Sequence, residues 1–410
     1  MFTRRDFLKA SSLMALAPTV PSFLARTARA VTAERDGRIL VVIQLDGGND
    51  GINTVVPFAD EGYAKHRKTL RLAKDQLVKI SDSVGLHASL RPAAKLLEAG
   101  QLAIVQGVSY PNPNRSHFES MAIWHSARLD REDRVGLGWL GRALDQDSSP
   151  TEAASSMFVG AGALPVALRG RRSVASVLER PEEFALSSSA DVRKLIDKET
   201  KLPHAEMGGI PSGDLAAFVE RSMLDAYATA DRLADLGNVA ISTDRYPDSG
   251  LGQHLQTVAR LIKAGFGTRI YYTAQSGYDT HNAQLRTHSD LLFNLSAALK
   301  AFLDDLTATK LADRVAVLIF SEFGRTVAEN GSAGTDHGTA GPVFLAGPGI
   351  KSGLMGATHS LLDLDPKHGD LKTSTDFRQL YASVLEDWLR LPAEPALGGK
   401  FAKLRLFREG

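Results

Sequence analysis

The chain has 410 residues, of which 43% are hydrophobic and 23% charged, a composition typical of a soluble globular protein. Its formal net charge of +1 gives no basic field of the kind that nucleic-acid binding requires, so no nucleic-acid partner is expected. The sequence contains no cysteine, which excludes disulfides, thiolate metal sites and cysteine nucleophiles.

Residues 1–30 have the pattern of a twin-arginine signal peptide. Arg4 and Arg5 precede a weakly apolar stretch over 10–25, and Ala28-Arg29-Ala30 offers a small-x-small cleavage site. This segment carries a surplus of four positive charges, so the remaining residues have a net charge of −3. We expect the twin-arginine translocase as a partner during export, and a periplasmic or secreted protein. The alternative is a basic amphipathic N-terminus of the mature fold.

Residues 31–410 are expected to form a single domain without a stable membrane span, because no later segment approaches about 18 uninterrupted apolar residues. The almost continuous apolar run Ile39–Leu45 predicts a strand that is buried on both faces, and Gly47, Gly48 and Gly51 then predict a turn. A short helix over Ser89–Ala99 and a second buried strand over Leu102–Val108 follow.

Pro111 and Pro113 predict an extended loop, so the next helix is expected to begin near Ser116 and to run through Trp124. Residues 127–250 carry weaker patterns and are interpreted as a lid or insertion. Within them we expect a loop at Ser187–Ser189 and a helix at Asp214–Leu236.

The C-terminal part predicts an α/β unit. A helix over Leu251–Lys263 leads into a strand over Thr268–Ala274, and an apolar stripe marks a long helix over Ala283–Thr309. That helix joins the strand Thr268–Ala274 to a strand at Val315–Phe320, which predicts a right-handed parallel crossover. A strand at Val343–Ala346 and a closing helix at Thr375–Leu389 complete the pattern. The predicted fold class is α/β, with a mostly parallel sheet sandwiched by helices.

Side chains that can bind a metal or attack an ester lie where five of these apolar runs begin or end. Ligands of open α/β sheets bind at the carboxyl edge of the strands, so we expect these groups to gather there as a metal-assisted hydrolase site. The candidates are Asp46, Ser116, His117, Asp279, His281, Glu322 and His337.

Asp46 begins a glycine-rich run in which a metal or an oxyanion could approach the backbone closely. An EF-hand is excluded because Gly48 and Pro57 occupy its third and twelfth positions; a plain Asp-Gly turn is the alternative. Ser116 is expected at a helix N-terminus, where an anion is stabilised, with Arg115 beside it to pair with a phosphate or sulfate oxygen. The alternative for Ser116 is a helix cap.

Asp279 and His281 are two residues apart, a spacing that a turn can direct at one ion but a helix face cannot. Glu322 ends the most apolar strand, and Arg325 could complement the charge of a substrate, although a salt-bridged strand end is the alternative. His337 lies in a glycine-rich loop and is either a metal ligand or a solvated histidine.

The sequence resembles the exported family named domain of unknown function 1501, which is grouped with the alkaline phosphatase and sulfatase superfamily. The resemblance rests on Arg4-Arg5-Asp6-Phe7-Leu8, on the run from Leu45 to Gly51, on Ser321-Glu322-Phe323-Gly324-Arg325 and on the run from Asp336 to Pro342. It implies an alkaline-phosphatase-like three-layer fold in which Asp46 is a first-strand ligand and Ser116 the nucleophile. Phe323 stands where that superfamily has a histidine ligand.

The predicted function is an exported metal-dependent hydrolase of phosphate or sulfate esters, acting on a small molecule or a glycan. One or two divalent ions (Zn, Ca, Mg or Mn) would be held by Asp46, Asp279, His281, Glu322 and His337. Ser116 or a water would attack, His117 would donate a proton, and Arg115 and Arg325 would grip the non-bridging oxygens.

A sulfatase that uses formylglycine is disfavoured, because no C/S-x-P-x-R motif lies near Ser116. Two alternatives remain. One is a catalytically degenerate exported binding or assembly protein, which Phe323 favours. The other is an enzyme that modifies a cell-envelope glycan.

Overall fold

The computed structural model describes residues 37–147, 156–173, 175–179, 246–357 and 360–408. The predicted signal peptide, the loop Ser187–Ser189 and the helix Asp214–Leu236 lie outside these residues, as does most of the predicted lid or insertion. No helix within the described ranges is both long enough and apolar enough to cross a membrane.

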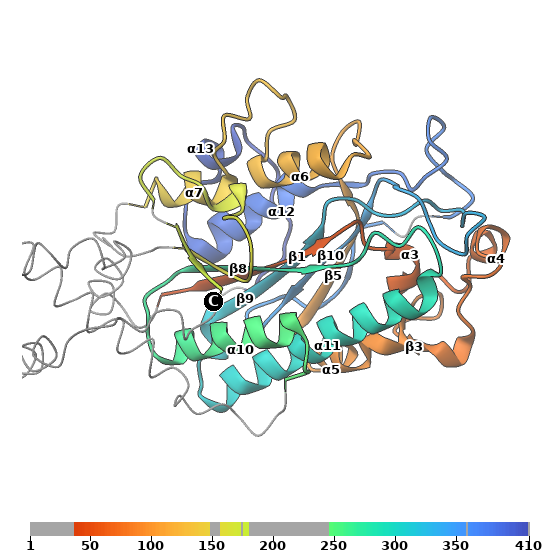
Figure 1. The fold of residues 1–410 in the computed structure, drawn as a ribbon, viewed down its shortest axis with the longest axis horizontal. Helices are drawn as coiled ribbons and strands as arrows, with labels where there is room; N and C mark the ends of the chain where they lie inside the picture. Colours follow the sequence, from red (N-terminus) through yellow and green to blue (C-terminus); the bar gives the residue numbers. More distant parts are fainter. Residues whose placement is uncertain (1–36, 148–155, 174, 180–245, 358–359, 409–410) are drawn as a thin grey trace, which may run out of the picture.

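One nine-stranded sheet organises the described part of the chain (Figure 1). Its order is β11-β5-β10-β9-β1-β8-β6-β7, and β12 also pairs with β5. The strands are β1 (Ile39–Asp46), β5 (Leu102–Ser109), β6 (Ser156–Val159), β7 (Ala175–Leu178), β8 (Ile270–Ser276), β9 (Val315–Ser321), β10 (Gly341–Ala346), β11 (Gly353–Met355) and β12 (Thr375–Asp376). A separate small sheet has the order β2-β4-β3 and contains β2 (Val55–Val56), β3 (Leu77–Lys79) and β4 (Gly85–His87).

The direction of the strands decides which loops meet. β1 runs parallel to both β8 and β9, so the predicted parallel relation of the two strands joined by the long helix is confirmed. β10 instead runs antiparallel to its neighbours β5 and β9. The loop before β10 therefore lies at the same edge as the loops that follow β1, β5, β8 and β9.

Two helical layers cover the sheet (Figure 1). One face carries α5 (Arg91–Glu98), α10 (Gly250–Lys263) and α11 (Gln284–Ala308). The other carries α6 (His117–Ser126), α7 (Trp139–Leu144), α12 (Phe377–Ser383), which continues as a π-helix over Val384–Leu389, and α13 (Ala393–Leu397). The short helices α3 (Gly51–Thr54) and α4 (Glu61–His66) follow β1.

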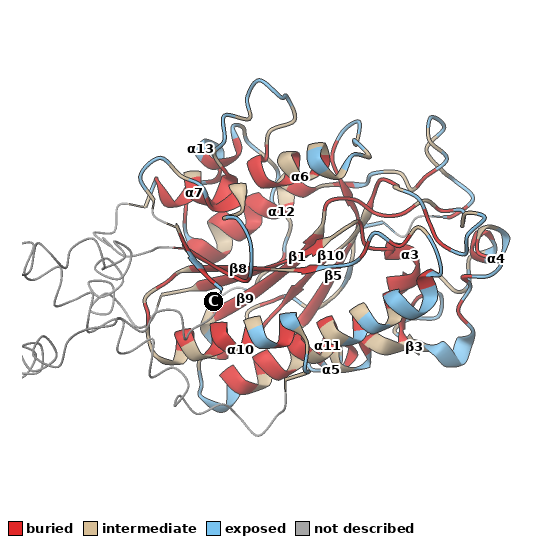
Figure 2. Ribbon diagram, in the orientation of Figure 1, coloured by how far each residue is buried: buried red, intermediate tan, exposed pale blue. Residues whose placement is uncertain are grey.

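The central strand β1 is covered by helices on both faces, which explains its almost unbroken apolar sequence. Val41 and Ile43 pack in the cluster that contains α5, α10 and α11, whereas Leu40 and Val42 pack in the cluster on the opposite face. Figure 2 shows the strands buried between the helices. A strand covered on both faces has no solvent side, so its sequence does not alternate. The predicted α/β sandwich is confirmed.

Candidate metal centre

Four polar side chains, one from the start of α6 and three from two loops, converge at the edge of the sheet where the strand ends meet. His117 is the first residue of α6, Asp279 and His281 follow β8, and His337 precedes β10. The ligand atoms of His117, Asp279 and His337 all lie within 4.8 Å of one another. His281 Nε2 lies 3.0 Å from Asp279 Oδ1 and 3.0 Å from His337 Nε2. The structure thus brings Asp279, His281 and His337 together and adds His117.

Two of the imidazoles donate their Nδ1 hydrogens away from the cluster. His337 Nδ1 is 2.8 Å from the Arg115 carbonyl oxygen, which can only accept a hydrogen bond. His117 Nδ1 is 2.7 Å from Glu322 Oε1, a carboxylate oxygen. In a neutral imidazole the other nitrogen then carries a lone pair. When both rings are neutral, Nε2 of each is therefore an acceptor, and the two atoms face each other at 3.0 Å.

His281 follows the same rule, because its Nδ1 is 2.9 Å from Asp336 Oδ1. Five of the six distances among the three Nε2 atoms and Asp279 Oδ1 are 3.0–3.4 Å. His281 adjoins His337 and Asp279 but lies outside the group of His117, Asp279 and His337, whose ligand atoms are all within 4.8 Å of one another. In a tetrahedral zinc site with bonds of about 2.0–2.1 Å, neighbouring ligand atoms are about 3.3 Å apart. Ring N–H groups bound to a carboxylate or carbonyl are the usual support of metal-ligating histidines. His117, Asp279 and His337 could hold one divalent cation, with His281 beside them as a fourth donor.

The cluster is partly open to solvent, which leaves room for a further ligand. The side chains of His117, Asp279, His281 and His337 are 29%, 49%, 42% and 27% exposed. The hydrogen bond to Glu322 raises the pKa of His117, whereas burial lowers the pKa of His337. The two rings thus differ in their readiness to accept a proton.

Arg325 forms an ion pair with Asp279. Burial alone would raise the pKa of Asp279, but the Arg325 guanidinium, 2.6 Å from Oδ1, lowers it to about 2. Arg325 was predicted to grip the substrate; instead its side chain is fully buried. Its guanidinium donates to the carbonyl oxygens of Gly47, Gly48, Tyr278 and Thr335. A buried guanidinium held this way supports the loops that surround it.

Glu322 occupies a nest of backbone amides that the sequence suggested for a metal or an oxyanion. The amides of Gly47 and Gly48 donate to its two oxygens at 2.9 and 3.1 Å. The single hydrogen of Ser321 Oγ can be donated either to Glu322 at 2.8 Å or to the Leu45 carbonyl oxygen at 2.7 Å. With the bond from His117, three of about four lone-pair sites of the carboxylate are used, and Ser321 can fill the fourth. The structure therefore places Glu322 as the support of His117, where the sequence suggested a direct ligand.

The two glycines are required by this arrangement. Gly47 has a φ of +114° and a Cβ there would lie 2.4 Å from the Asp279 amide nitrogen. Gly48 has a φ of +78° and a Cβ there would lie 2.4 Å from the ring of Phe323. That ring is buried and packs 4.9 Å from the ring of His117 and 5.1 Å from that of His337, centre to centre. Phe323 thus fills the space beneath the two imidazoles.

Asp46 and Asp50 have different surroundings. Asp46 is half-buried, accepts hydrogen bonds from Gln44 Nε2 at 2.7 Å and Ser276 Oγ at 3.4 Å, and burial raises its pKa. Its carboxylate is thus engaged beside the cluster, where the sequence predicted a ligand. Asp50 is fully buried against Arg67 at 2.6 Å; although its burial opposes ionisation, the guanidinium lowers its pKa to about 2.

Ser116 and Arg115 flank the cluster through their position before α6. Ser116 is exposed, and although it occupies the N-cap position its side chain makes no capping hydrogen bond. Arg115 was predicted to bind substrate, but its guanidinium is paired with Asp370. Only its backbone carbonyl reaches the cluster, through His337. The hydroxyl of Ser116 is free to act, whereas the charge of Arg115 is already neutralised.

Two supporting residues, Asp336 and Asp370, were not singled out from the sequence. Asp336 directly precedes His337 and could have been suggested by that adjacency. Nothing near Asp370 in the sequence indicates that it pairs with Arg115.

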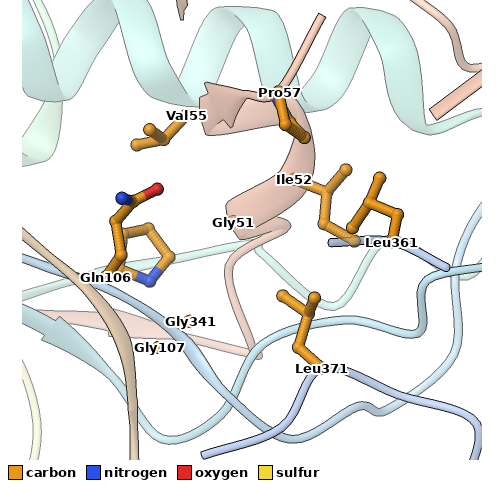
Figure 3. A pocket seen from close by; sticks show the side chains of 10 residues that line it. Gly51, Ile52, Val55, Pro57, Gln106, Gly107, Gly341, Leu361 and Leu371 are labelled. Carbon is orange, nitrogen blue, oxygen red and sulfur yellow. The ribbon is translucent and has the colours of Figure 1, made fainter. Parts of the chain in front are cut away.

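A hollow of about 40 Å³ beside the first turn of α3 contrasts with the cluster (Figure 3). Its lining is apolar except for Gln106, whose Nε2 has no hydrogen-bond partner within the described residues. It contains no titratable group and none of the clustered side chains. The chemistry that this edge can support therefore belongs to the exposed cluster.

The chain was compared with known proteins. A search of curated proteins finds no match. Similar solved structures include a sulfatase from Pseudoalteromonas sp. (10% identity, 93% of this chain and 74% of that chain, TM-score 0.39). A protein in the alkaline phosphatase superfamily from Vibrio parahaemolyticus gives 10% identity, 81% and 70% coverage, and a TM-score of 0.35. A phosphonate monoester hydrolase from Silicibacter pomeroyi has 10% identity, and the match covers 90% of this chain and 76% of that chain with a TM-score of 0.33. Residues 38–391 match the family described as "Protein of unknown function (DUF1501)", and the chain belongs to that family.

Proposed function

We propose that the chain is a metal-dependent hydrolase of phosphate or sulfate esters, with one divalent ion held by His117, Asp279, His281 and His337. The convergence of three imidazole lone pairs and one carboxylate oxygen carries this proposal. Without a cation or a proton between them, these acceptors would repel one another at 3.0–3.4 Å. Three imidazoles favour zinc or a similar transition metal over calcium or magnesium, which prefer oxygen ligands.

When bound, the ion would supply positive charge that stabilises the anionic ester and lowers the pKa of an attacking hydroxyl. The chain's own groups would do the rest. Ser116 presents an unengaged hydroxyl at the N-terminus of α6, where the helix dipole favours an anion, and is proposed as the nucleophile. Arg325 keeps Asp279 ionised, and Glu322 orients His117. The choice of phosphate or sulfate esters rests on this serine and on the resemblance of the sequence motifs.

Metal analysis and a panel of aryl phosphate and aryl sulfate esters test the proposal. We expect about one equivalent of zinc or a similar metal in the purified protein and turnover of at least one ester class. Asp279→Asn and His337→Ala should lose both metal and activity, whereas Ser116→Ala should lose activity and keep the metal. A metal-free, inert wild-type protein would refute the proposal.

A second candidate is a metal-binding protein without turnover, which Phe323 favours because it fills the space beneath His117 and His337. It predicts one bound ion in the wild type and no hydrolysis of any ester in the panel. An enzyme that modifies envelope glycans would be separated by activity on cell-wall fragments alone.

We also propose export by the twin-arginine route, supported by Arg4, Arg5 and the Ala28-Arg29-Ala30 site in the sequence. Replacing both arginines by lysine should retain the protein in the cytoplasm. Unchanged export of that variant would contradict this part of the proposal.

A further inference from the structure

Gln284, the first residue of α11, is completely buried, and its carboxamide contacts three separate loops at the candidate metal centre. Its Oε1 accepts hydrogen bonds from Thr280 Oγ1 at 3.0 Å and from Thr335 Oγ1 at 2.6 Å. Its Nε2 donates to Asp50 Oδ2. One side chain therefore joins segments that are more than 200 residues apart in the sequence.

The three partners are close neighbours of the proposed ligands. Thr280 stands between Asp279 and His281, and Thr335 is two residues before His337. Asp50 follows Gly47 and Gly48, whose amides hold the Glu322 carboxylate that orients His117. Movement of any one of these loops would change the distances within the cluster.

We propose that Gln284 is the positioning residue of the metal centre, which fixes the loops that carry Asp279, His281 and His337 relative to one another. This inference rests on the proposed function for the identity of the bound ion. Gln284 itself touches none of the ligand atoms and acts through Thr280, Thr335 and Asp50. It is therefore a positioning residue and not a catalytic one.

Only an amide satisfies all three partners at once. Two hydroxyl donors need an acceptor, and the carboxylate of Asp50, which also binds Arg67, needs a donor. A glutamate would offer no hydrogen and would place a second negative charge against Asp50. A methionine would fill similar space and offer neither function. Replacing Gln284 by methionine therefore removes its hydrogen bonds while keeping most of its packing.

The test compares Gln284→Met with Ser296→Ala, a control on the same helix. Ser296 is also fully buried, but its hydroxyl accepts from the Ala93 amide at 2.8 Å and serves the contact with α5. Zinc affinity is measured by competition with a chelator, and the absorption spectrum of the cobalt-substituted protein reports the geometry. Loss of a supporting partner typically weakens metal affinity 10–100-fold.

We expect Gln284→Met to bind zinc 10–100-fold more weakly, with an altered cobalt spectrum, and Ser296→Ala to match the wild type in both. Equal affinity in all three proteins, or the same weakening in both variants, would overturn the inference. If Gln284→Met does not fold, Thr280→Val and Thr335→Val each remove one bond. Weaker zinc binding in both supports the inference, and wild-type affinity in both overturns it.

Amide hydrogen exchange of the metal-free protein separates this inference from the proposed function. A wild type that binds no metal defeats the proposed function but leaves the exchange result valid. The Thr335 amide donates to the Thr280 carbonyl oxygen at 3.1 Å, and the Ile52 amide donates to Asp50. Faster exchange of both amides in Gln284→Met, but not in Ser296→Ala, supports the positioning role of Gln284. Unchanged exchange at both positions would overturn it.

Discussion

Replacing Glu322 by glutamine distinguishes a supporting residue from a metal ligand. Glu322 is 1% exposed, and its carboxylate accepts hydrogen bonds from Gly47, Gly48 and His117, with Ser321 Oγ as a further possible donor. An amide keeps the shape but turns one acceptor oxygen into a donor. At least one of the buried donors then loses its partner, at a cost of about 1–3 kcal/mol, and the remaining bonds lose their charge assistance. We expect the free energy of unfolding to fall by about 2–4 kcal/mol.

The same change should weaken metal binding without abolishing it. Loss of a partner that orients a ligating histidine costs about 10–100-fold in affinity. Because the hydrogen bond to Glu322 is the main cause of the raised pKa of His117, that pKa should fall in the metal-free variant. Urea denaturation, zinc competition and histidine titration by NMR measure the three effects.

Two control variants define the scale. Asp279→Asn removes a proposed direct ligand and should abolish binding. Glu329→Gln alters another carboxylate that is held by backbone amides, those of Thr69 and Leu70, and should leave zinc affinity unchanged. Binding lost as completely in Glu322→Gln as in Asp279→Asn would refute the reasoning, because Glu322 would then be a ligand.

Three further outcomes are expected. Phe323→His should not add a second ion to the metal count, because the Glu322 carboxylate is already engaged by Gly47, Gly48 and His117; two equivalents by elemental analysis would contradict this. Gly48→Ala should unfold at lower urea concentration, since a positive φ costs about 1–3 kcal/mol before the clash with Phe323; an unchanged midpoint would refute it. Asp50→Asn should destabilise the fold by about 3–5 kcal/mol by stranding the buried Arg67. Because the pKa of Asp50 is lowered to about 2, its contribution is present above its ordinary value of 3.8 and is lost as pH falls toward 2. In an acid titration, the free energy of unfolding of Asp50→Asn should not show this loss.

Periodicity was enough to predict the elements that a single hydrophobic pattern defines. The run that became β1 and the stripe that became α11 could be read because each is long and buried. The short strands β2, β3, β4, β6 and β7 have two to four residues each and carry no such signal. The direction of β10 depends on pairing with β5 and β9, which are far away in sequence.

Some features of the site also follow from the sequence, and others do not. That Asp279, His281 and His337 would meet follows from their positions at strand ends, together with the reversed direction of β10. The buried state of Arg325 and the pairing of Arg115 with Asp370 do not follow, because they depend on which carbonyls and carboxylates the folded loops bring near. Sequence identifies a charged residue near a site, but only packing decides whether its charge is already neutralised.

The most direct measurement is the anomalous scattering of a crystal grown with zinc. We expect one peak within about 2.0–2.2 Å of the Nε2 atoms of His117, His281 and His337 and of Asp279 Oδ1. A crystal without a peak at these atoms, or with the ion bound to Asp46 and Glu322 instead, would contradict it.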